Sequence, residues 1–200
     1  MLYLIRHAEA AGNAEGRIMG QRDLPLTDRG REQAQALGEW CARQGLVFGT
    51  VFASDLSRAW DTAAILARAT ASPAPVARPG LREVGRGELE GRTYAEARAL
   101  RATAVGLEPP QIVAARISRV ARELRAAALE GPVAAVGHGG SVARLLRFYL
   151  GLRPEPLPGD MGFSLQNSGV CILDFRAPRP ALLAVNALPH LADWHPPIGR

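Results

Sequence analysis

Short apolar runs alternate with longer amphipathic stretches along most of the chain. The runs have the length of strands, and their unbroken apolar character is typical of strands buried on both faces of a sheet. We predict strands at residues 2–5, 50–53, 76–78 and 132–136, and at 163–166, 170–175 and 182–185 near the C-terminal end.

The amphipathic stretches predict helices in the intervals between these strands. Thr27 is placed to cap a helix over 29–43, and Ser54 or Asp55 to cap a second helix that reaches residue 69. Further helices are predicted at 93–101, 111–129 and 141–150.

The predicted helix at 111–129 has a continuous apolar face and a row of arginines. Because arginines three residues apart drift around a helix, we interpret them as a solvated surface and not as a binding stripe. The apolar face comprises Val113, Ile117, Val120 and Leu124, and the arginines are Arg116, Arg119, Arg122 and Arg125.

Strands that alternate with helices predict an α/β fold, a three-layer α/β/α sandwich with a mostly parallel central sheet. The chain has 200 residues, of which 48% are hydrophobic and 22% charged, as in ordinary globular proteins. It shows no internal repeat, linker or low-complexity segment. We therefore expect residues 1–200 to form a single domain.

No apolar stretch reaches the ~18 residues of a membrane span, and the apolar start is too short for a signal peptide. Cys41 and Cys171 lie far apart and form no motif, so we expect buried, reduced thiols. These features predict a cytoplasmic protein that acts on no membrane. The sequence allows a homodimer but carries no further sign of oligomeric state.

The formal net charge is +5, and all 24 basic residues are arginine. The arginines are dispersed and only 6% of residues are aromatic, a pattern that does not favour nucleic-acid binding. Guanidinium groups still favour anions, because they are always charged and can bind carboxylate or phosphate with two hydrogen bonds. We therefore expect a small anionic partner and no nucleic acid.

Two predicted strands end directly in histidine. His7 follows the first strand, and His138 follows the strand at 132–136. Ligands of open α/β sheets bind beyond the carboxyl ends of the strands, so both histidines are candidate site residues. Arg6 precedes the first histidine and Arg58 lies early in a predicted helix, where an anion is favoured. The glycines around His138 also suit a tight turn alone.

Seven short motifs occur together in this chain. They are Arg6-His7; Asn13 with Gly16-Arg17 and Gly20; Pro25-Leu26-Thr27 with Gly30; Ser54-x-Leu56-x-Arg58-Ala59-x-x-Thr62-Ala63; Leu81-Arg82-Glu83 with Glu90-Gly91; Gly137-His138-Gly139-Gly140; and Asn186 with His190-Leu191. In this order they resemble the histidine phosphatase superfamily, the phosphoglycerate mutase-like proteins, over essentially the whole chain. The spacing favours its short phosphatase branch.

The resemblance implies a metal-independent phosphomonoesterase with no cofactor, acting on a small phosphate ester. His7 would form a phosphohistidine, and Glu83 would be the general acid and then the base. We expect nearby cations to keep Glu83 ionised, so that its proton arrives with the substrate. Arg6, Arg58 and His138 would stabilise the phosphoryl group. Asn13, Gly20, Gln21 and Gly139 are the expected substrate-binding residues.

Some residues depart from the family pattern or compete for these roles. Ala8 replaces a usual glycine, and activity should survive unless that position needs a positive φ. Substrate choice is affected by Met19, Arg86 and Leu89, which stand where a polar residue, an aromatic residue and a tryptophan are common. Glu9, Glu88 and Glu90 are weaker alternatives for the acid, and Glu90 is expected to pair locally. His190 and His195 are interpreted as non-ligands.

Four other arginines could ring the pocket and recognise a second anionic group, or be solvent-exposed. They are Arg17, Arg22, Arg82 and Arg86.

Three alternatives stay beside a broad phosphomonoesterase. One is an α-ribazole-5′-phosphate phosphatase of cobalamin synthesis, and another is a phosphoglycerate mutase. A mutase is disfavoured because only 54 residues lie between Glu83 and His138, too few for the insertion that mutases carry. The third, from a different class, is a non-catalytic phosphate-binding scaffold.

Overall fold

A six-stranded sheet forms the centre of the computed structural model, which describes residues 1–153, 162–176 and 179–191. The spatial order of the strands is β3-β2-β4-β1-β5-β6. β1 to β4 run parallel, whereas β5 and β6 are antiparallel to their neighbours. The strands are β1 (Leu2–Arg6), β2 (Thr50–Ala53), β3 (Val76–Ala77), β4 (Val133–Gly137), β5 (Val170–Asp174) and β6 (Ala181–Ala187).

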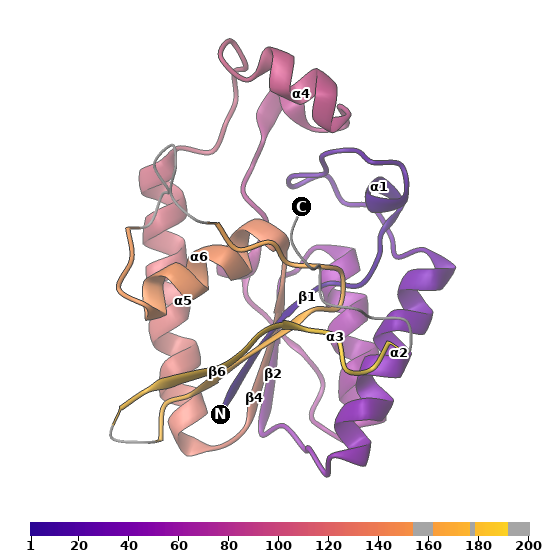
Figure 1. Cartoon of the computed structure of the whole chain (residues 1–200), viewed down its shortest axis with the longest axis vertical. Helices are drawn as coiled ribbons and strands as arrows, with labels where there is room; N and C mark the ends of the chain where they lie inside the picture. The colour runs from indigo at the N-terminus through magenta and orange to yellow at the C-terminus, as the bar shows by residue number, and fades with distance from the viewer. Residues whose placement is uncertain (154–161, 177–178, 192–200) are drawn as a thin grey trace.

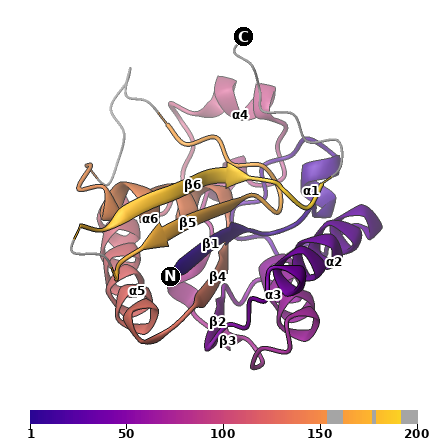
Figure 2. The same cartoon turned by 60° about the horizontal axis from the view of Figure 1, so that its bottom comes forward.

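Helices cover both faces of this sheet (Figures 1 and 2). α2 (Asp28–Arg43) and α3 (Ser57–Ala69) pack on one face, and α5 (Pro110–Glu130) and α6 (Gly139–Tyr149) on the other. α4 (Tyr94–Leu100) stands apart, beyond the end of the sheet, with the short α1 (Ala11–Ala14) near it. Two 3₁₀ turns, Pro79–Leu81 and Gly87–Leu89, complete the elements of the described residues.

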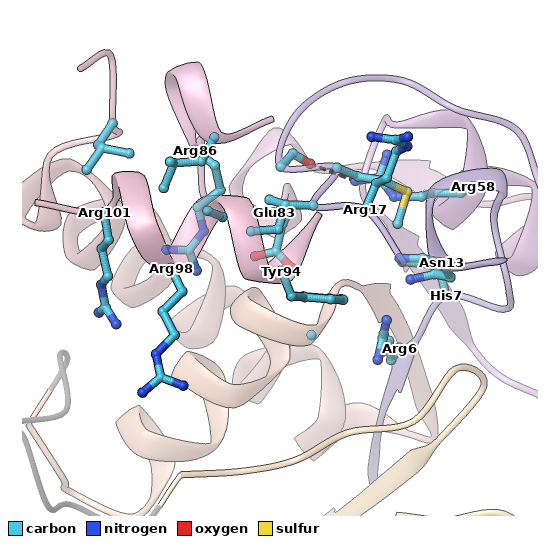
Figure 3. A pocket seen from close by; sticks show the side chains of 17 residues that line it. Arg6, His7, Asn13, Arg17, Arg58, Glu83, Arg86, Tyr94, Arg98 and Arg101 are labelled. Carbon is cyan, nitrogen blue, oxygen red and sulfur yellow. Dashed lines mark hydrogen bonds between the residues drawn. The ribbon is translucent and has the colours of Figure 1, made fainter. Parts of the chain in front are cut away.

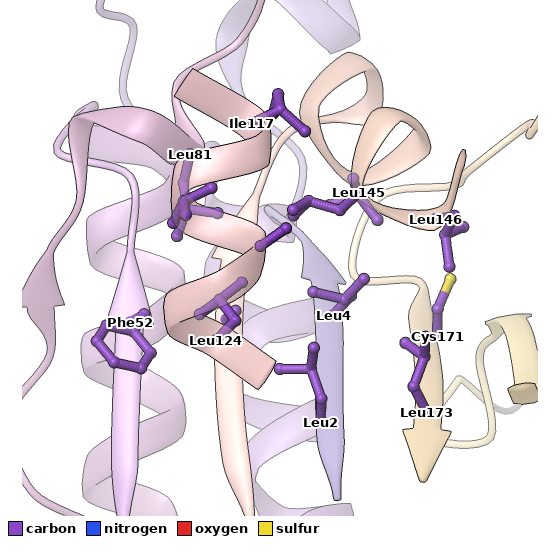
Figure 4. Packing of buried hydrophobic residues seen from close by; sticks show 14 of the residues in the cluster. Leu2, Leu4, Phe52, Leu81, Ile117, Leu124, Leu145, Leu146, Cys171 and Leu173 are labelled. Carbon is purple, nitrogen blue, oxygen red and sulfur yellow. The ribbon is translucent and has the colours of Figure 1, made fainter. Parts of the chain in front are cut away.

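Alternating side chains of β1 enter two separate cores. Leu2 and Leu4 belong to the cluster beneath α5 and α6, whereas Tyr3 and Ile5 belong to the cluster beneath α2 and α3. Figure 4 shows Leu2 and Leu4 packed against Leu124 of α5. A strand that is apolar at every position is thus buried on both faces. The predicted α/β sandwich is confirmed.

The predicted strand at 163–166 is wrong. No strand forms there, because its backbone groups bind side chains in place of a neighbouring strand: the Leu165 carbonyl accepts from Arg6 at 2.5 Å, and the Gln166 N–H donates to Asn186 Oδ1 at 2.7 Å. Asn186 has a left-handed φ of 52°. The apolar pattern alone did not show this competition.

Of the two predicted helix N-caps, the one on α2 is confirmed and the one on α3 is wrong. Thr27 caps α2, since its side chain accepts from the Gly30 N–H. The Ser54 or Asp55 cap of α3 is wrong, because the N-cap is Leu56 and no side chain of the cap residue binds the helix. Asp23, from a distant loop, accepts from the Ser57 N–H at 2.8 Å instead.

The arginines of α5 do not all form a solvated face. Arg119 and Arg122 are exposed, as predicted. Arg116 is largely buried and hydrogen-bonded. Arg125 is exposed, and its guanidinium carbon lies 5.6 Å from the centre of the Phe175 ring. The prediction is therefore wrong for Arg116.

Cys41 and Cys171 are both buried free thiols, as expected. Within the described ranges, no helix combines the length and the apolar character needed to cross a membrane.

Truncating a buried side chain of α5 should lower the free energy of unfolding more than truncating an exposed side chain of the same helix. Leu124 is fully buried, and Leu124→Ala should lower the free energy of unfolding by about 2–5 kcal/mol, because it removes apolar burial and leaves a cavity. Leu129→Ala, on the same helix at a half-exposed site, is the control and should change it by about 0.5 kcal/mol or less. Urea denaturation measures both, and equal losses would contradict the assigned core.

Candidate active site

The two strand-end histidines come from neighbouring parallel strands. Arg6 of β1 is paired in register with Gly137 of β4, and the His7 N–H donates to the Gly137 carbonyl at 2.9 Å. Both imidazoles are buried, and their ring centres lie 5.0 Å apart. The adjacency of β1 and β4 therefore brings together residues that are far apart in the sequence.

His7 is held as a neutral imidazole with one free nitrogen. Its Nδ1 lies 2.6 Å from the Ala8 carbonyl, an acceptor, so Nδ1 carries the proton and Nε2 keeps its lone pair. Burial lowers the pKa of His7 well below 6.5, and the charges of Arg58 and Arg6 lower it further. A neutral imidazole with a free Nε2 can act as a nucleophile at neutral pH.

His138 is oriented by Ser54. The Ser54 hydroxyl lies 2.9 Å from His138 Nε2, and Ser54 Oγ also accepts from the Leu56 N–H. A hydroxyl that donates to Nε2 leaves the proton on Nδ1, which can donate to a ligand. Burial, and after it the neighbouring His7 and Arg58, lower the pKa of His138 well below 6.5.

Arg58 is held by backbone carbonyls and has no carboxylate partner among the described residues. It is fully buried and donates to the carbonyls of Gly20 and Arg22, both at 2.8 Å. Gly20 offers its carbonyl from a left-handed φ of 52°, which glycine adopts without strain. Arg6 likewise donates to the Leu165 carbonyl. The positive charges are thus fixed in place without a carboxylate in ion-pair contact among the described residues.

Three buried nitrogens at this point lack a partner within the described residues: Arg6 Nε, Arg58 Nε and His138 Nδ1. The fourth such atom of the described chain is His190 Nδ1. An unpaired buried donor is costly, so unpaired donors on neighbouring residues indicate a site for a ligand that accepts hydrogen bonds. With two uncompensated guanidinium groups there, the ligand is an anion.

Glu83 is anchored at the N-terminus of α6. Its Oε2 accepts from the Gly140 N–H at 2.9 Å, and its Oε1 accepts from the Val84 N–H at 2.7 Å. A Cβ at position 140 would clash with the Glu83 carboxylate, so the last glycine of the Gly-His-Gly-Gly motif makes room for Glu83. Glu90 accepts from the N–H groups of Gln21 and Arg86, which confirms its predicted local pairing.

Asn167 supports the site and was missed by the sequence analysis, which identified no motif around it. Its Nδ2 donates to the His7 carbonyl and to Asn13 Oδ1, both at 3.1 Å. The Ala10 N–H also donates to Asn13 Oδ1. Because two donors fix the oxygen of the Asn13 amide, its NH₂ group is left to donate into the cavity.

A cavity of about 580 Å³ opens over these groups (Figure 3). Among the described residues that line it, cations are in excess and Glu83 is the one acidic side chain. Its lining includes the predicted Arg6, His7, Asn13, Gly20, Arg58, Glu83 and Gly139, together with Met19, Leu89, Tyr94, Leu107 and the arginines Arg17, Arg86, Arg98 and Arg101.

Tyr94, Arg98 and Arg101 were missed by the sequence analysis. They come from α4 and the residue after it, and their spacing of four and three residues places them on one helical face. The weak periodicity of this segment hid that face. Figure 3 shows Arg98 and Arg101 on the side of the cavity away from Arg6 and His7.

Several predicted residues lie outside the cavity lining. His138 is one of them, although its ring centre lies 5.0 Å from that of His7, which does line the cavity. The Gln21 amide donates to the Glu83 carbonyl and to Glu108, and Arg82 pairs with Asp55. Arg22 also lies outside the lining, although its carbonyl holds Arg58.

The structure also bears on Ala8, which replaces the usual glycine, and on the two late histidines, His190 and His195. Ala8 does not have a positive φ, so the condition that would have made this alanine harmful is absent. His190 is hydrogen-bonded to Ser168, and burial lowers its pKa to about 4. His195 lies outside the described residues.

Comparisons with known proteins identify the family of this chain. A family model described as the histidine phosphatase superfamily (branch 1) matches residues 2–188. The chain is 36% identical over 183 residues to a glucosyl-3-phosphoglycerate phosphatase of Mycolicibacterium vanbaalenii, covering 80% of each protein. It is 32% identical over 188 residues to a probable phosphoglycerate mutase of Yersinia pestis, covering 88% of this chain and 85% of the relative.

Solved structures show the same fold. A mycobacterial glucosyl-3-phosphoglycerate phosphatase in complex with VO3 aligns with a TM-score of 0.77 at 32% identity, covering 93% of this chain and 98% of that one. The α-ribazole phosphatase of Shigella flexneri aligns with a TM-score of 0.79 at 25% identity, covering 94% and 96%. The predicted enzyme class, a phosphoric monoester hydrolase, is confirmed, and the chain belongs to the histidine phosphatase superfamily.

Proposed function

We propose that this protein hydrolyses a small phosphate ester through a phosphohistidine on His7, without a metal ion or cofactor. One observation carries the proposal. The free Nε2 of a neutral His7 lies among buried donors that lack partners in the described chain, on Arg6, Arg58 and His138. A phosphoryl group supplies the three acceptor oxygens that these donors require.

In the first step, His7 Nε2 attacks phosphorus in line with the leaving oxygen. The new P–N bond forms as the P–O ester bond breaks, and Glu83 gives the leaving oxygen the proton that arrived with the substrate. Arg6, Arg58 and His138 hold the equatorial oxygens. The Ala8 carbonyl, which accepts from Nδ1–H, stabilises the positive charge that develops on the imidazole ring.

In the second step, water replaces His7 at phosphorus. The Glu83 carboxylate takes a proton from the water, the P–N bond breaks, and phosphate leaves with His7 neutral again. Asn13 and the N–H of Gly139, at the start of α6, add hydrogen bonds to the transferred group. The residue roles support hydrolysis and equally a transfer to a second alcohol, which is why mutase activity is a second candidate.

The far side of the cavity favours a substrate with a second anionic group. Arg86, Arg98 and Arg101 line it and have no carboxylate partner among the described residues. A carboxylate or a second phosphate on the ester would meet them. Glucosyl-3-phosphoglycerate and α-ribazole phosphate, named for the relatives, are test substrates. A cytoplasmic location and a homodimer stay predictions from the sequence.

Replacing His7 should abolish turnover without unfolding the protein. His7→Ala removes the nucleophile, so kcat/KM for p-nitrophenyl phosphate should fall by more than about 10³-fold. EDTA should leave the wild-type rate unchanged. An active His7→Ala protein would contradict the phosphohistidine, an EDTA-sensitive wild type would contradict metal independence, and a wild type inactive at every pH would favour the scaffold.

The imidazole of His7 should stay neutral at pH values where an ordinary histidine is half protonated. Burial and two guanidinium groups lower its pKa, so protonation should begin only well below pH 6.5. ¹³C NMR of labelled histidine measures this in the free enzyme, and the chain has only four histidines to assign by single variants. A His7 resonance half-titrated at pH 6.5 or above would show that burial and the two guanidinium groups do not lower the pKa of His7.

The α4 arginines should matter only for esters with a second anion. Arg98→Gln/Arg101→Gln should raise KM for such esters about tenfold, as expected for the loss of two partly solvated ion pairs, and leave p-nitrophenyl phosphate unaffected. Arg119→Gln, an exposed arginine of α5, is the control. Equal effects on both substrates would show that these arginines do not recognise a second anionic group.

The products formed from 3-phosphoglycerate distinguish the two candidate activities. Release of free phosphate indicates a phosphatase, and formation of the isomeric phosphate ester indicates a mutase.

A further inference from the structure

The side chain of Arg116 is buried although the sequence placed it on a solvated face. It is 16% exposed, and its partner Glu108 is 13% exposed. Arg116 Nε and a terminal nitrogen donate to the two carboxylate oxygens of Glu108 at 2.7 and 2.8 Å. A two-bond pair of this kind has fixed geometry and is costly to break when buried.

The remaining donors of Arg116 reach three backbone carbonyls between residues 80 and 83. They bind the carbonyls of Gly80 at 3.0 Å, Arg82 at 2.8 Å and Glu83 at 3.1 Å. Together with the two bonds to Glu108, these contacts use all five guanidinium N–H groups. Arg116 therefore fixes the backbone immediately before and at the residue proposed as the acid.

Glu108 fixes the same loop on its other side. Its Oε2 accepts from the Gly85 N–H at 2.9 Å. The Gln21 amide connects Glu108 Oε2, at 3.4 Å, with the Glu83 carbonyl, at 3.1 Å. Burial raises the pKa of Glu108, but the hydrogen bonds from Arg116 and Gly85 outweigh burial and hold it below its ordinary value. The pair is thus ionic at neutral pH.

The loop needs such support because residues 82–85 form no helix or strand. The carbonyls of Arg82 and Glu83 accept from Arg116 in place of a neighbouring strand, so the position of this backbone depends on that side chain. Neither Arg116 nor Glu108 is among the residues that line the cavity, so we expect both to act through Glu83 and not on the substrate itself.

We propose that the Arg116–Glu108 pair positions Glu83, holding its carboxyl where the leaving oxygen takes its proton. The inference rests on the acid role of Glu83 proposed above. Loss of the pair should therefore impair the proton transfer selectively and leave phosphate binding by Arg6 and Arg58 intact.

Leaving groups of different acidity separate this role from a general structural one. Nitrophenolate departs as a stable anion and needs little help from an acid, whereas an alkoxide must be protonated as it leaves. The measured quantity is the ratio of kcat/KM for p-nitrophenyl phosphate to kcat/KM for an alkyl phosphate. Because both values come from one sample, the ratio is independent of the fraction of enzyme that is folded.

The variants are Arg116→Gln and Glu108→Gln, with Glu83→Gln as the reference. Glu83→Gln should raise the ratio about 10²-fold or more. Arg116→Gln and Glu108→Gln should each raise it about tenfold, although they change the local charge in opposite directions. Arg116→Lys keeps the charge but not the five-donor fork, and should not restore the wild-type ratio.

Two substitutions on the same helix serve as matched controls. Arg119→Gln removes an exposed arginine, and Glu123→Gln breaks the ion pair of α5 with Arg78, which does not reach Glu83. Both should change the ratio less than twofold.

The outcomes distinguish a failure of the positioning role from a failure of the acid role of Glu83. If Glu83→Gln raises the ratio but both pair variants leave it unchanged, the positioning role is wrong and the acid role stands. Ratios that move in opposite directions in Arg116→Gln and Glu108→Gln, or a full return to wild type in Arg116→Lys, would assign the effect to charge and overturn the inference. If Glu83→Gln leaves the ratio unchanged, the acid role fails and the inference fails with it.

Discussion

Two guanidinium groups are held in the protein interior by backbone carbonyls, and the active site depends on this arrangement. Arg58 donates to the carbonyls of Gly20 and Arg22, and Arg6 to that of Leu165. A carboxylate in these places would have cancelled the charge. Carbonyls fix the geometry and leave the charge for a ligand, at a cost in stability that a bound anion offsets. The same charges help to keep His7 neutral.

Regular structure supplies few of the contacts that orient the catalytic groups. β1 and β4 bring His7 and His138 together, but the surrounding loops are ordered by side chains. Asn167 joins the His7 carbonyl to Asn13, and Arg116 binds the carbonyls around Glu83. Rigid strands thus place the nucleophile, and hydrogen-bonded loops complete the site around it.

The sequence predicted the parts of the fold that follow from local patterning. Buried parallel strands and the helix over 29–43 have strong periodicity, and the strand-end histidines were found from it. The pattern failed where a tertiary partner decides the structure. Residues 163–166 are apolar enough for a strand, but Arg6 and Asn186 take their backbone groups. At ~100° per residue, Arg116 lies only about 40° from Val120, at the edge of the apolar face. That position allows Arg116 to be buried. Its pairing with Glu108 could not be predicted, because Glu108 lies in a loop and helical periodicity does not describe loops.

The central proposal for this enzyme is that phosphate is carried covalently on His7. Rapid quenching of the enzyme with ³²P-labelled substrate, followed by peptide mapping, tests it directly. We expect label on the peptide that contains His7, stable in base and lost in acid as a phosphoramidate is, and formed and lost at rates compatible with turnover. Label on another residue, or turnover with no labelled peptide at any time, would contradict it.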